Sequence, residues 1–60
     1  MYRLLELCRG KNGVKAYLEY PDGNIRVSWF FKEHTNKEIA EHLRKEGFFT
    51  DRYRETITSF

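Results

Sequence analysis

The sequence predicts a small α+β domain, in which a three-stranded antiparallel meander carries one helix on one face. Two observations support this prediction. Residues 14–32 form two consecutive runs of alternating apolar and polar side chains, separated by a Pro-Asp-Gly-Asn turn. Residues 35–47 combine a capping box, an apolar stripe of helical period and a final glycine. We expect strands at about 2–9, 14–20 and 25–32, a helix at about 36–46 and a tail from 48 to 60.

The chain of 60 residues is expected to form one domain with a small core. A chain of this length buries only about 60% of the surface that its unfolded state exposes. Cys8 is the single cysteine, which excludes an internal disulfide, and it has no metal-site spacing to His34 or His42. The chain also holds one tryptophan, four tyrosines and five phenylalanines. We therefore expect good packing or self-association to supply the missing stability.

The first strand is predicted over residues 2–9. The segment before Gly10 is short for an independent helix. Residues 10–13 read Gly-Lys-Asn-Gly, which is typical of a tight reversal. Residues 2–9 are therefore expected to pair with residues 14–20. The leucines of the first strand do not share one face, which indicates partial cover on both sides.

The hairpin over residues 14–32 has one predicted core side and one predicted free side. Pro21 fixes φ at the start of the turn, Asp22 can bond its own backbone, and Gly23 accepts a positive φ. The side chains expected to face the helix are Val14, Ala16, Leu18, Ile25, Val27, Trp29 and Phe31. The free face is then expected to carry Lys15, Tyr17, Glu19, Arg26, Ser28, Phe30 and Lys32.

The helix has the clearest signals in the chain. Thr35 and Glu38 form a T-x-x-E capping box. Gly47 stands where a left-handed C-cap is expected, and basic residues precede it in the last turn. The stripe expected to pack on the sheet is Ile39, Ala40 and Leu43. In the tail, β-branched and aromatic residues favour a fourth strand or an extended arm over a second helix capped by Asp51.

The run from 35 to 43 resembles the first helix of a helix-turn-helix motif, in which T-x-x-E-I-A-x-x-L is common. The resemblance implies a second, DNA-reading helix over residues 51–60. The chain departs from the motif after Leu43. Arg44 stands where a glycine is usual, and Lys45 and Thr50 stand where apolar residues are usual. We therefore favour the alternative, a capped amphipathic helix packed on a sheet.

The predicted free face of the hairpin alternates cations with aromatic rings, a pattern that suits nucleic acid. Cations neutralise phosphates, and rings stack on bases or sugars. The residues expected to bind nucleic acid, DNA in the first instance, are Lys15, Tyr17, Arg26, Phe30 and Lys32. The architecture also resembles the sheet-reading DNA-binding domains of some integrases and plant transcription factors, which implies a sheet in the major groove.

Other readings of the same face stay open. Aromatic residues and arginine also favour protein interfaces. The chain could then be a small regulator or inhibitor of the kind that phages and plasmids encode, docking on a larger protein through this face. It could also form a homodimer that buries the face, or Tyr17 and Phe30 could simply be a stabilising cross-strand pair. A net charge of +2 permits a polyanionic partner and does not require one.

Several classes of function are not expected. No spacing suggests a nucleophile with a base and an orienting group, so we expect no enzyme, cofactor, metal or small-molecule substrate. No apolar run approaches the roughly 18 residues of a membrane span. The residues after Met1 are too few and too charged for a signal peptide. We therefore expect a cytoplasmic protein with no membrane partner.

Overall fold

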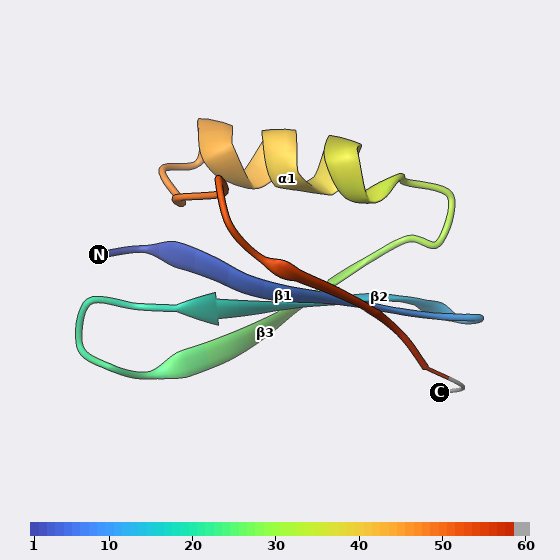
Figure 1. Cartoon of the computed structure of the whole chain (residues 1–60), viewed down its shortest axis with the longest axis horizontal. Coiled ribbons are helices and arrows are strands. Elements are labelled where there is room, and N and C mark those ends of the chain that lie inside the picture. Colours follow the sequence, from blue (N-terminus) through green and yellow to red (C-terminus); the bar gives the residue numbers. More distant parts are fainter. Residues whose placement is uncertain (59–60) are drawn as a thin grey trace.

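The described part of the chain folds into one four-stranded sheet with a single helix above one face (Figure 1). The computed structural model describes residues 1–58. The elements are β1 (Arg3–Gly10), β2 (Gly13–Glu19), β3 (Ile25–Phe30), α1 (Asn36–Lys45) and β4 (Arg54–Ile57). The strand order is β3-β2-β1-β4; the β1–β2 and β2–β3 pairs are antiparallel, and β4 runs parallel to β1. The predicted α+β meander and its fourth strand are confirmed, and the part of the tail prediction over 59–60 lies outside the described residues.

The core lies between α1 and the two central strands. It consists of Leu4 and Leu7 from β1, Val14, Ala16 and Leu18 from β2, and Ile39, Ala40 and Leu43 from α1. The predicted helix stripe and the predicted inner side of β2 are thereby confirmed. A β-bulge between Leu4 and Glu6 explains how Leu4 and Leu7, three residues apart, both face the helix.

The helix begins and ends as predicted. The Thr35 hydroxyl accepts a hydrogen bond from the Glu38 backbone N–H at 3.1 Å, and the Glu38 carboxylate accepts one from the Thr35 N–H at 2.8 Å. Gly47 has a φ of 102°, and the N–H of Phe48 donates to the carbonyl of Leu43 at 3.0 Å. This left-handed turn closes the helix and sends the chain back to the sheet.

The tail joins β1 along its outer edge. Phe49 accepts a hydrogen bond from Leu4 N–H and donates one to the Tyr2 carbonyl, each at 2.9 Å. Further on, Thr56 of β4 donates its hydroxyl proton to the Glu6 carboxylate at 2.7 Å. Within residues 1–58 the chain therefore follows α1 with a strand, and the second helix that a helix-turn-helix would need does not form.

The predicted faces of β3 are wrong. Val14 lies opposite Phe30, and Lys15 lies opposite Trp29. Opposed residues in an antiparallel pair share a face of the sheet. The side chains on the helix side are therefore Arg26, Ser28 and Phe30, and those on the outer face are Ile25, Val27 and Trp29.

The β2–β3 turn explains this reversal. Tyr20 N–H donates to the Asn24 carbonyl, and Gly23 N–H donates to the Tyr20 carbonyl, each at 2.9 Å. The loop thus holds three residues, and its last residue, Gly23, has a φ of 88°. A four-residue turn would have placed Tyr20 opposite Ile25. The shorter loop shifts the register by one residue, which moves every β3 side chain to the other face.

Candidate binding surface

The outer face of the sheet carries an apolar strip at its β3 margin. Ile25, Val27 and Trp29 follow one another on this face, with 60%, 46% and 59% of their surfaces exposed. Tyr17 lies beside Val27 on β2 and is half-buried. We call Tyr17, Ile25, Val27 and Trp29 the outer strip. Scattered exposed apolar residues are ordinary, but a contiguous row on one strand indicates a contact surface.

The five predicted nucleic-acid-binding residues do not share one surface. Lys15 and Tyr17 lie on the outer face as predicted. Arg26 lies on the helix side, with its guanidinium 4.5 Å from the centre of the Tyr20 ring.

The other two predicted residues also leave the outer face. Phe30 lies on the helix side, with its ring centre 5.9 Å from that of His42. Lys32 follows the end of β3, in the connection to α1. The expected cation-aromatic face is therefore divided between the two sides of the sheet.

Charges of both signs surround the outer strip. The ammonium group of Lys15 lies 5.3 Å from the centre of the Trp29 ring, a cation–π distance. Arg3 pairs with Glu19 at 2.6 Å, next to Ile25 in the same row of the sheet. This distribution suits an apolar contact with a polar rim better than a continuous phosphate track.

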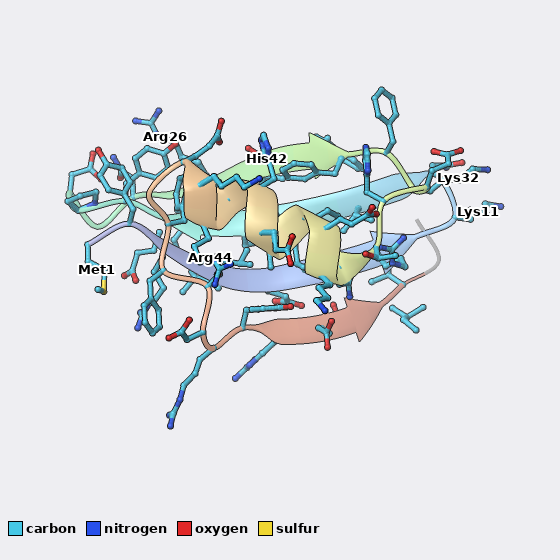
Figure 2. All side chains as sticks on the ribbon, turned by 90° about the horizontal axis from the view of Figure 1, so that it is seen from above. Met1, Lys11, Arg26, Lys32, His42 and Arg44 are labelled. Atoms are coloured by element: carbon cyan, nitrogen blue, oxygen red, sulfur yellow. The ribbon has the colours of Figure 1, made fainter. Side chains whose placement is uncertain are left out.

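The third strand also has a free edge. β3 is the terminal strand of the sheet, and Figure 2 shows no described element beyond its margin. The other terminal strand, β4, is shorter and carries Arg54 and Glu55. Short length and charged side chains protect an edge strand against pairing, whereas β3 has six residues and a single charge, Arg26.

A hollow of about 420 Å³ lies between α1 and the end of β3. It is lined by Trp29, Phe30, Phe31, His34, Glu38, Ile39 and His42. Glu38 is engaged by the helix cap, and the backbone N–H of Thr35 that bonds its carboxylate lowers the pKa of Glu38 below the ordinary glutamate value. Residues 1–58 contain no group of three or more histidine, cysteine or carboxylate side chains that could hold a metal ion.

Arg9 holds the connection between β3 and α1 in place. Its guanidinium donates to the carbonyl of Lys32 at 2.9 Å, to the carbonyl of His34 at 2.6 Å and to the side-chain oxygen of Asn36 at 2.8 Å. Asn36 in turn donates to the Glu55 carboxylate of β4 at 2.8 Å. One arginine on β1 thus fixes the loop that forms one wall of the hollow, a role that sequence reasoning missed.

Sequence reasoning also missed Ile25, Val27 and Trp29 as surface residues. The sequence shows that they alternate with polar residues, but alternation alone does not say which side is buried. The available signal was the turn: Asp22 accepts hydrogen bonds from the backbone and side-chain N–H groups of Asn24, each at 2.9 Å, and holds the three-residue loop closed.

Comparison with models of protein families, with curated proteins and with solved structures found no match to this chain. In residues 1–58, no helix has the length and apolar character needed to cross a membrane.

Proposed function

We propose that this chain is a non-enzymatic binding protein that docks on a larger protein through the outer strip. The observation that carries the proposal is the row of Ile25, Val27 and Trp29, which are exposed together on a terminal strand. An exposed apolar row of this kind lowers solubility and promotes aggregation. A partner that covers the row is therefore its best explanation. Tryptophan and tyrosine are also the residues that dominate interface energies.

The chemistry around the strip indicates what the partner offers. Lys15 borders Trp29 on the outer face, and Lys11 and Lys32 lie at the same end of the sheet (Figure 2). A complementary partner would present an apolar groove for the Trp29 ring, with acidic side chains on the rim nearest these lysines. Such rim contacts would speed association and weaken with salt, while the buried ring would set the dissociation rate.

The test is capture of a specific partner from a lysate of the source cells, followed by binding measurements with the purified partner. Trp29→Ala and Val27→Ser are expected to weaken binding at least about tenfold, as interface anchors do. Ile57→Ser is the matched control, because Ile57 is 87% exposed and lies on β4, away from the strip. Equal binding by all three variants would contradict the proposal.

DNA binding through the same face is a second candidate. It is favoured by Lys15 and Tyr17 on the outer face, with the Trp29 ring beside them as a stacking surface. Trp29 is the single tryptophan, so its fluorescence reports directly on this face. Titration with duplex and single-stranded DNA at low salt should quench Trp29, and Lys15→Ala should reduce the salt dependence by about one phosphate contact. A titration without response would remove this candidate.

A further inference from the structure

We propose that the free edge of β3 pairs with the β3 edge of a second copy of this chain. The two strands run antiparallel across a two-fold axis, with Val27 opposite Val27 of the second copy. The two four-stranded sheets thereby become one continuous sheet. This inference goes beyond the proposed function, because it concerns the backbone edge of β3 and not the outer face.

The hairpin bonds determine which backbone groups reach the free edge. Tyr20 and Asn24 form the hydrogen-bonded pair next to the loop. Hydrogen-bonded pairs recur at every second position along an antiparallel ladder, so the even-numbered residues of β3 direct their N–H and C=O groups toward β2. The odd-numbered residues, Ile25 and Val27 among them, therefore direct theirs away from β2, and a second strand can bond Ile25 and Val27 there.

The side chains are self-complementary about Val27. With Val27 on the axis, Ile25 of each copy lies opposite Trp29 of the other, and Arg26 lies opposite Ser28. Apolar side chains thus meet apolar side chains, and the one charge of the strand faces a neutral hydroxyl. Centring the pair on Ser28 instead would set Arg26 opposite Phe30 and place Ile25 beyond the paired strand.

Nothing in the described chain obstructs this pairing. Figure 1 shows α1 above the sheet, and Figure 2 shows β3 uncovered along one margin. The Gly23 position, which lies opposite Phe31 in this register, has open space where a Cβ would stand. Phe31 is 76% exposed, and its ring can lie against the turn of the second copy.

Pairing also answers the stability problem of a short chain. Below roughly 70–80 residues a single core supplies little net stability, and oligomerisation is one of the usual remedies. The two outer strips would join at the axis into one apolar surface, which would present the partner with two tryptophans.

The first experiment measures oligomeric state by sedimentation velocity from low to high micromolar concentration. The wild-type chain should form dimers. Val27→Pro removes only an edge-facing N–H, which is where a strand tolerates proline, so this variant should stay folded and become monomeric. We expect its dimer dissociation constant to rise at least about tenfold, the change produced by about 1.4 kcal/mol. Val27→Thr keeps the N–H group and is the matched control, and it should raise the dimer dissociation constant less than Val27→Pro does.

The second experiment tests the register by disulfide trapping in a Cys8→Ala background. Opposed residues on the axis have Cα atoms about 5.5 Å apart, within disulfide reach, so Val27→Cys should form a cross-linked dimer under mild oxidation. Ser28→Cys should not, because its two copies would lie about 8 Å apart. Circular dichroism and thermal melting verify that each variant is folded.

A wild-type chain that stays monomeric at every concentration would overturn the inference, and the edge would then be open to a strand of another protein. Cross-linking through Ser28→Cys and not Val27→Cys would overturn the register. These results are distinct from failure of the proposed function. A dimer that captures no partner contradicts only the docking proposal, whereas a monomer that captures one contradicts only the pairing.

Discussion

Arg9 offers the sharpest test of how this small domain holds together. Its guanidinium makes three hydrogen bonds to the connection between β3 and α1 and to the first residue of the helix. Hydrogen bonds from charged donors contribute about 1.5–3 kcal/mol each. Two of these three bonds lie at exposed positions. We therefore take about 1 kcal/mol for each bond and expect Arg9→Ala to lower the free energy of unfolding by about 2–3 kcal/mol.

That loss is large for a chain of this size. Stabilities of about 0.05–0.15 kcal/mol per residue imply roughly 3–9 kcal/mol for the whole domain. One kcal/mol shifts the melting temperature of a small domain by about 4–8 °C, so Arg9→Ala should lower it by about 10–20 °C. The assay is thermal and urea denaturation followed by circular dichroism, with all variants at one protein concentration.

Two matched variants separate the hydrogen-bond network from simple charge. Arg9→Lys keeps the cation and loses the planar fork, so it should recover no more than about half of the loss. Arg3→Ala removes one exposed ion pair with Glu19 and should cost less than about 1 kcal/mol. If Arg9→Ala destabilises no more than Arg3→Ala, the network does not hold the loop as described.

Four further outcomes follow from the contacts. Thr35→Ala should cost about 1 kcal/mol in urea denaturation, because it removes the helix N-cap. The backbone N–H of Thr35 lowers the pKa of Glu38. The ionised carboxylate therefore stabilises the fold above the ordinary glutamate pKa, and this stabilisation is lost as the pH falls through the lowered pKa. Glu38→Gln should therefore flatten the acid limb of a stability–pH curve. Phe30→Ala should lower the free energy of unfolding by about 2–3 kcal/mol, and Ile25→Ser should lower it by less than about 1 kcal/mol. This order is the reverse of what the sequence pattern predicts, and thermal melting under monomeric conditions measures it. Gly23→Ala should cost about 1 kcal/mol by the same assay, because φ is 88° there.

The parts of the fold that the sequence predicts well are those that local chemistry determines. The helix is fixed by Thr35 and Glu38 at its start and by Gly47 after its end, and each of these residues acts within a few positions of its own backbone. The first hairpin follows in the same way from its glycine-rich reversal. Arg9 could not be predicted, because its acceptors are 23 to 27 residues away and two of them are backbone carbonyls that any residue could supply.

The candidate site depends on the length of the loop between β2 and β3, because that length sets which β3 side chains face the helix. Whether Trp29 or Phe30 faces the helix depends on one residue of loop length, and the same four letters, Pro-Asp-Gly-Asn, are compatible with both turns. Asp22 decides the matter by bonding Asn24, and Gly23 supplies the positive φ that the shorter loop needs. The predicted side of the sheet is therefore correct for Lys15 and Tyr17 on β2 and wrong for Arg26 and Phe30 on β3.

The observed register also explains why the outer strip exists at all. A helix of ten residues spans about 15 Å and packs over β1 and β2, where the core lies. It covers the helix side of β3 only in part, at Phe30, and leaves the outer face, with Ile25, Val27 and Trp29, exposed. A sequence selected only for stability would place polar residues at such positions. The chain instead keeps a continuous apolar row on its least protected strand, and a local rule broken in this way is the usual mark of a surface retained for contact.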